Sequence, residues 1–130
     1  MKNNRASLAA LCIVIGATLG GCSRPVSDEV KTVQEVTTAV AAGDAQPVRE
    51  RFTGQAQALL TPKFVDRFHT VIGPLGAITS VAEQPKPSGV ENHHVFVVTF
   101  EKGERVEDAW FNAEGKIQRW EVHPAGAKPQ

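Results

Sequence analysis

The stretch VENHHVFVVTF, residues 90–100, decides the fold of this 130-residue chain. Its side chains fall into two alternating sets, which are Phe96, Val98 and Phe100 in one and Val95, Val97 and Thr99 in the other. Alternate residues of a β-strand point to opposite faces of a sheet. We therefore predict the longest strand of the protein here, with the other segments arranged around it.

Three shorter segments show the same period of two. They are residues 77–83, 105–112 and 117–122. Turn residues separate them: a proline-rich turn at 84–89, a tight turn at Lys102-Gly103, and a hairpin turn at 113–116 with Gly115 at the positive-φ position. Because short turns join antiparallel neighbours, we predict a four-stranded antiparallel meander.

The apolar residues before the strands follow a helical period instead. Ser27 is a plausible N-cap, the acidic residues Asp28 and Glu29 suit a first turn, and Gly43 ends this first helix. Asp44 can cap a second, short helix, since proline and apolar residues follow it at the expected positions.

A third and longer helix starts at Thr61-Pro62, an N-cap threonine with proline at the first helical position, and ends at Gly73-Pro74. Residues 56–60 fit either a loop or one turn of helix. Helices followed by a meander predict an α+β fold in which three N-terminal helices pack on the sheet. We place this single domain at residues 28–123, followed by a disordered tail at 124–130.

The chain begins with a segment of a different kind. Lys2 and Arg5 form a short basic head, and a run of about 14 apolar or small residues follows, at 6–19. A transmembrane helix needs roughly 20 such residues. A basic head, a short apolar run and small residues at the exit predict a secretory signal peptide at residues 1–21.

The exit reads Leu19-Gly20-Gly21-Cys22, which resembles the lipobox of bacterial lipoproteins. That resemblance implies a diacylglyceryl group on the thiol of Cys22, cleavage after Gly21, and acylation of the new amino group. Two or three acyl chains hold a protein firmly at a membrane. Residues 22–27 would then be a tether, and Ser23 favours the outer membrane, facing the periplasm. The alternative is an ordinary secretion signal with a chance cysteine.

Composition limits what the mature chain can be. Removal of residues 1–21 leaves 109 residues with 12 basic and 14 acidic side chains, which suits one domain and gives no basic face for nucleic acid. Cys12 leaves with the signal and Cys22 takes the lipid, so the domain has no disulfide and no thiol chemistry. We expect no cofactor and no metal.

The order of elements resembles the nuclear-transport-factor-two-like superfamily, the cone-shaped fold shared with ketosteroid isomerase. Three passages carry the resemblance: TAVAAGD at 38–44 running into Phe52, LTP at 60–62 with the helix after it, and FNAEGKI at 111–117. It is similar in particular to small secreted bacterial members of undefined function. The resemblance implies a carboxylate base among apolar walls in those members that are isomerases.

Asp108 is the weak catalytic candidate. It shares a strand face with Val106 and Trp110, and apolar walls would raise its pKa if that face were concave. The alternative is a solvated carboxylate, or an ion pair with Arg119 across the hairpin.

Other candidate groups offer less chemistry. His93 and His94 are adjacent on a strand, so they point to opposite faces and cannot chelate one metal without a bulge. Asp66 and His69 lie three apart on the third helix and can pair. The ligand-binding candidates are Phe68, Asp108, Trp110 and Trp120. The two tryptophans either line a ligand cleft or fill the end of a small core.

These observations predict a membrane-anchored lipoprotein whose small domain binds an apolar ligand or an envelope protein without catalysis. The alternative is an isomerase or dehydratase with Asp108 as general base, for which the sequence supplies no second polar group. A third possibility is a homodimer formed through an exposed sheet face.

Overall fold

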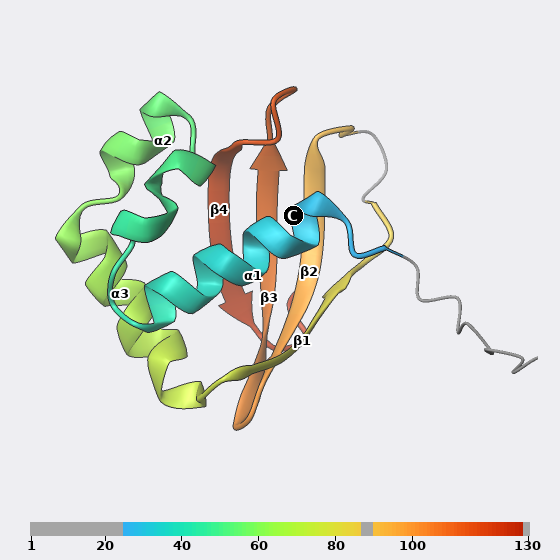
Figure 1. Cartoon of the computed structure of the whole chain (residues 1–130). Helices are drawn as coiled ribbons and strands as arrows, with labels where there is room; N and C mark the ends of the chain where they lie inside the picture. Colours follow the sequence, from blue (N-terminus) through green and yellow to red (C-terminus); the bar gives the residue numbers. More distant parts are fainter. Residues whose placement is uncertain (1–24, 87–89, 129–130) are drawn as a thin grey trace, which may run out of the picture.

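The computed structural model describes residues 25–86 and 90–128, so the predicted signal peptide, Cys22 and the first part of the predicted tether lie outside the described residues. Helices and turns come first, and four strands follow (Figure 1). The helical elements are α1 Asp28–Ala41, η1 Gln46–Arg51, α2 Gly54–Leu59, α3 Pro62–Ile72 and η2 Gly73–Leu75. The strands are β1 Ile78–Glu83, β2 His93–Phe100, β3 Gly103–Phe111 and β4 Ile117–Pro124. The predicted α+β class is confirmed.

The four strands form one antiparallel sheet in the order β1-β2-β3-β4, as the meander predicts. The pairing of β2 with β3 is regular from His93 opposite Trp110 to Phe100 opposite Gly103. Register shifts occur near the start of β1 and at the end of β3. This register decides which β3 side chains share a face with the large apolar residues of β2.

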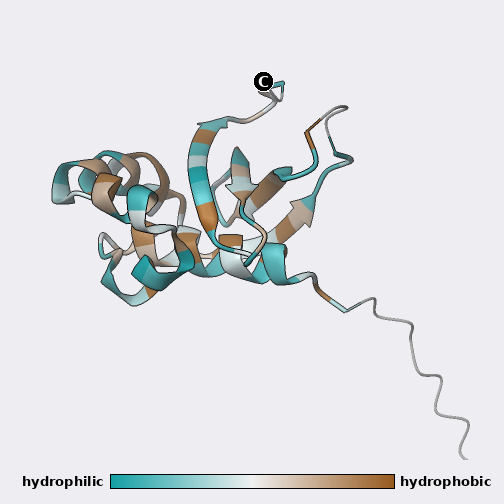
Figure 2. Ribbon diagram, turned by 90° about the horizontal axis from the view of Figure 1, so that it is seen from above, coloured by the Kyte–Doolittle hydropathy of each residue, from teal (hydrophilic) through white to brown (hydrophobic). Residues whose placement is uncertain are grey.

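The helices cover one face of the sheet, which we call the inner face (Figure 1). Its β2 residues Phe96, Val98 and Phe100 belong to the same buried cluster as Val33 and Val36 of α1. Figure 2 shows the helical layer and the sheet from above. The opposite, outer face carries the other alternate set, in which Val95 and Val106 are buried but lie outside that cluster.

Side-chain caps begin three of the helices. Ser27 accepts a hydrogen bond from the backbone N–H of Val30 at the start of α1, and Thr61 accepts one from Phe64 at the start of α3. Proline fits the first position of α3, because a backbone N–H at that position would have no partner within the helix. Gly43, with φ of 82°, follows the end of α1 in the left-handed region, where glycine has no Cβ penalty.

Several element boundaries differ from the sequence predictions. Residues 90–92 form a turn in which Val90 accepts a hydrogen bond from His93, so β2 starts three residues late. Residues 56–59 belong to helix α2, which Thr53 caps, and Leu60 follows the end of the helix. The first residues of the tail that we expected to be disordered have regular structure. Strand β4 runs to Pro124, and the backbone N–H of Ala127 donates to the Pro124 carbonyl in a turn.

Among the described residues, none of the helices combines the length and apolar character needed to cross a membrane.

The cap of α3 yields a test. Replacement of Thr61 by alanine removes the acceptor for the Phe64 N–H, so we expect the free energy of unfolding to fall by about 1 kcal/mol in urea denaturation. Thr61→Ser keeps the acceptor and should lose far less. Equal losses for the two variants would show that the hydroxyl does not cap this helix.

Candidate functional site

The structure does not bring the four predicted ligand-binding residues together. Asp108 and Trp110 lie on β3 at outer-face positions, because their partners on β2 are Val95 and His93. Phe68 of α3 instead packs on Trp120 at the inner face, with ring centroids 5.2 Å apart. The β2–β3 register places Asp108 on the face of the sheet opposite the helices.

Asp108 is the centre of a buried polar cluster on the outer face. Its residue exposure is 1%, and its Oδ1 lies 2.5 Å from Nε2 of His93. A carboxylate only accepts hydrogen bonds, so the His93 N–H is the donor. The second oxygen, Oδ2, lies 3.1 Å from Nε2 of His123, but the two are not aligned for a hydrogen bond.

Arg119 does not pair with Asp108, and both alternatives for this carboxylate, solvated or paired with Arg119, are wrong. The Arg119 guanidinium binds Glu121 on its own strand and lies over the Trp110 ring, 4.8 Å from the centroid. Trp110 in turn stacks on His93, with centroids 4.2 Å apart and planes within 4°. This layered arrangement of guanidinium, indole and imidazole covers the buried carboxylate.

The burial of Asp108 bears on catalysis. A general base must come within hydrogen-bond distance of the proton that it removes. One Asp108 oxygen is occupied by His93, the other faces His123, and the residue is almost completely excluded from solvent. In this arrangement Asp108 is hydrogen-bonded to His93, lies beside His123 and is closed to a substrate.

The neighbouring carboxylate, Glu107, lies on the inner face of the sheet. It is fully buried, at 0% exposure. Its Oε2 accepts hydrogen bonds from Oγ1 of Thr37 on α1, at 2.7 Å, and from Nε1 of Trp120 on β4, at 3.0 Å. Its Oε1 has no partner among the described residues. The carboxyl therefore ties the first helix to the last two strands.

Burial raises the pKa of Glu107 from 4.5 to about 7, and the hydrogen bonds from Thr37 and Trp120 offset part of that rise by favouring the ionised form. Sequence reasoning missed this residue. The hairpin register offered the signal: once Phe100 pairs with Gly103, Phe96 lies opposite Glu107. A carboxylate opposite the most buried phenylalanine of β2 must lie in the core.

The two tryptophans have different environments. Trp120 is 6% exposed and belongs to the core, where the Phe68 ring packs against it at a tilt and Phe64 packs in turn against Phe68. The hollow next to Trp120 measures only about 80 Å³, well below the roughly 300 Å³ at which ligand pockets begin. Of the two possibilities for Trp120, cleft or core filling, the geometry supports core filling.

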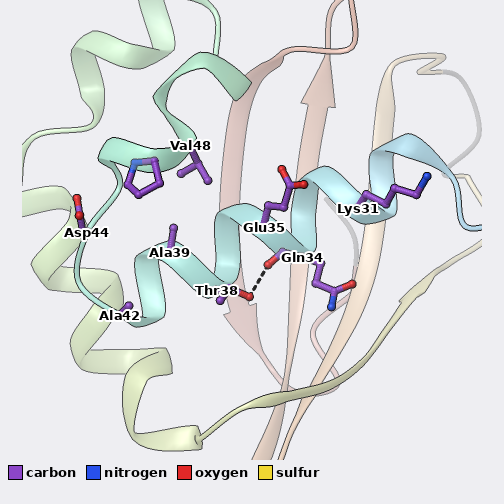
Figure 3. A pocket seen from close by; sticks show the side chains of 9 residues that line it. Lys31, Gln34, Glu35, Thr38, Ala39, Ala42, Asp44 and Val48 are labelled. Atoms are coloured by element: carbon purple, nitrogen blue, oxygen red, sulfur yellow. Dashed lines mark hydrogen bonds between the residues drawn. The ribbon is translucent and has the colours of Figure 1, made fainter.

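A wider groove lies between α1 and η1 (Figure 3). Its volume is about 770 Å³, and its apolar wall is formed by Ala39, Ala42, Pro47 and Val48. The polar residues at its edge have partners nearby, as Glu35 contacts Arg51 at 2.6 Å. The Asp44 carboxylate at its other end accepts from the backbone N–H of Gln46. An open, mostly apolar groove of this kind suits an uncharged ligand or a partner surface.

The remaining histidine expectations resolve as follows. His93 and His94 do point to opposite faces: His93 bonds Asp108, and His94 bonds Glu83. The pairing of His69 with Asp66 is wrong, because Nδ1 of His69 lies 2.7 Å from the Ala41 carbonyl oxygen and joins α3 to α1. In residues 25–86 and 90–128, no three histidine, cysteine or acidic side chains are placed to hold a metal ion.

Comparison of the chain with protein-family models, with curated proteins and with solved structures finds no match.

The Glu107 geometry predicts a pH-dependent stability. The folded pKa of about 7 exceeds the ordinary 4.5, so the folded state prefers the protonated acid. Stability is then full below about pH 4.5 and falls as the pH rises through 7, by about 3 kcal/mol in total. In Glu107→Gln this loss is absent. Relative to wild type, the variant should gain about 3 kcal/mol between about pH 4 and about pH 8 in urea denaturation.

The matched control is Glu114→Gln, which makes the same chemical change at an exposed hairpin residue. Its stability difference from wild type should stay constant over the same pH range. A constant difference for Glu107→Gln as well would contradict the raised pKa.

Proposed function

We propose that this chain is a lipid-anchored protein of the bacterial cell envelope, held at the outer membrane and facing the periplasm, and that it acts by binding rather than by catalysis. The lipobox at Leu19–Cys22 supports the anchor. The burial of both candidate carboxylates supports binding over catalysis, because Glu107 and Asp108 are 0% and 1% exposed. That burial is the observation on which the functional conclusion rests.

The position of the anchor keeps the domain close to the lipid surface. Asp28, the first residue of α1, is six positions after Cys22, and an extended chain spans at most about 3.5 Å per residue. The domain therefore stays within roughly 20 Å of the lipid. In this arrangement the groove between α1 and η1 is available to a small apolar ligand or an envelope protein.

We also propose that the helices and the sheet form the cone of the nuclear-transport-factor-two-like superfamily. The three sequence passages and the placement of the helices on one sheet face support this proposal. In this chain the cone interior is occupied by side chains, with Trp120 and Phe96 almost fully buried. A filled interior favours surface binding over a deep substrate pocket.

The anchor is tested at its thiol. In Cys22→Ser, the hydroxyl cannot take the diacylglyceryl group, so we expect the protein to stay unprocessed or to leave the membrane fraction. Intact-mass spectrometry and membrane fractionation measure both effects. Cys12→Ser is the matched control, because that cysteine lies inside the signal segment, and it should be lipidated and cleaved as wild type. An unchanged mass and membrane fraction for Cys22→Ser would contradict the proposal.

A further inference from the structure

The outer face of the sheet contains buried apolar residues on the side away from the helices. Val95 of β2 and Val106 of β3 are 1% and 5% exposed, although the helices pack on the other face. Val106 lies directly opposite His123 of β4. In the turn after β4, the Ala127 N–H donates to the Pro124 carbonyl, and Ala127 lines one hollow of about 350 Å³ together with both valines. The end of β4 and this turn therefore lie beside the two valines.

Asp108, on the same face, needs a positively charged partner. Its exposure is 1%, and a buried ionised carboxylate is costly unless a positive charge faces it. Arg119 does not supply that charge, because its guanidinium binds Glu121. Among the described residues, the basic groups within ion-pair distance of Asp108 are the rings of His93 and His123. One of these two rings is therefore the source of the charge when Asp108 is ionised.

Of the two rings, His123 is the one with access to solvent protons. Its side chain is 22% exposed, against 2% for His93, which stacks on the Trp110 ring. Nε2 of His123 lies 3.1 Å from Oδ2 of Asp108 and 3.4 Å from Oε2 of Glu121. Carboxylate oxygens only accept hydrogen bonds, so this nitrogen carries a hydrogen, and the charge of the ring depends on a second proton at Nδ1.

The facing atoms of Asp108 and His123 are buried without a hydrogen bond. Oδ2 of Asp108 and Nε2 of His123 are close together, but within the described ranges neither has an aligned partner. Buried polar atoms are nearly always hydrogen-bonded, so this adjacent pair needs a physical reason. A rotation of the ring would pair both atoms, and a positive charge on the ring favours that contact. The other charged side chains on this face or in the turn after β4 are Glu104, Arg119, Glu121 and Lys128.

We propose that His123 is a proton-dependent clamp on the outer face. As an imidazolium ion it faces Asp108 and holds the end of β4, with the turn after it, over Val95 and Val106. As a neutral ring it leaves the carboxylate without that charge, and the end of β4 opens. Because two carboxylates favour the cation, the clamp is closed at acidic pH and opens as the pH rises through the range in which histidine titrates, about 5 to 8. The clamp involves neither the lipid on Cys22 nor the groove between α1 and η1, so it is tested separately from the proposed function.

The experiment follows valine methyl signals by NMR in the purified full chain in detergent, from about pH 5 to about pH 8. We expect the signals of Val95 and Val106 to shift with the same midpoint as the ring signal of His123. His123→Gln keeps a hydrogen-bonding group but cannot become charged, so the part of the shift that follows His123 should be lost. Glu107 titrates in both proteins, and comparison of the two therefore isolates the effect of His123. The ring is partly exposed, so the variant should fold normally.

Urea denaturation gives a second measurement. His123→Gln should raise the equilibrium constant for unfolding about tenfold more at about pH 5 than at about pH 8, as expected for loss of a contact between charged groups. The control is His69→Gln, because His69 contacts Ala41 in the helical layer, and it should leave the valine shifts as in wild type. The proposal is overturned if the valines shift alike in wild type and His123→Gln, if His69→Gln abolishes the shift as well, or if the effect of His123→Gln on unfolding is the same at both pH values.

Discussion

The hydrogen bonds of one buried carboxyl group hold the two layers of this protein in register. Glu107 accepts from Thr37 on α1 and from Trp120 on β4, two residues that are 83 positions apart in the chain. Apolar packing drives the layers together but is not directional. A buried hydrogen bond is directional, because a displaced helix would take the Thr37 donor away from a carboxyl in the core, at a cost of about 1–3 kcal/mol. The position of α1 across the sheet therefore depends on this contact.

The alternation of side chains along a β-strand explains why the adjacent carboxylates Glu107 and Asp108 have different surroundings. Glu107 points to the helices and Asp108 to the outer face, because successive residues of a strand alternate. Both carboxylates are buried, but different neighbouring groups offset the cost of burying them. Glu107 receives two neutral donors and has its pKa raised by burial, whereas Asp108 lies between two imidazoles under a stacked indole. In both arrangements the carboxylate makes contacts within the fold and is inaccessible to a substrate.

The elements of the fold could be predicted from local chemistry, because their signals lie within a few residues of one another. Thr61-Pro62 marked the start of α3, Gly115 marked the hairpin with φ of 77°, and the alternation around Phe96 marked the central strand. The candidate site could not be predicted in the same way. Which face of β3 meets the helices depends on the pairing with β2, so the sequence alone did not show that Glu107, and not Asp108, lies beneath the helices.

The local sequence pattern also could not predict side-chain contacts between residues that are far apart in the chain. Nothing near Asp108 in the sequence indicates His123, and nothing near His69 indicates the Ala41 carbonyl, since these contacts exist only after the layers pack. In the function proposed above, the lipid on Cys22 would fix the location of the protein, and the groove between α1 and η1 would supply the binding surface.

The most direct measurement of this account is the titration of the Glu107 side-chain carboxyl carbon by NMR, with the signal assigned by its absence from Glu107→Gln. The account predicts a midpoint at about pH 7, because burial disfavours the ionised form. A midpoint near the ordinary value of 4.5 would show that the carboxyl is hydrated, and would contradict the claim that it ties the first helix to the sheet inside a dry core.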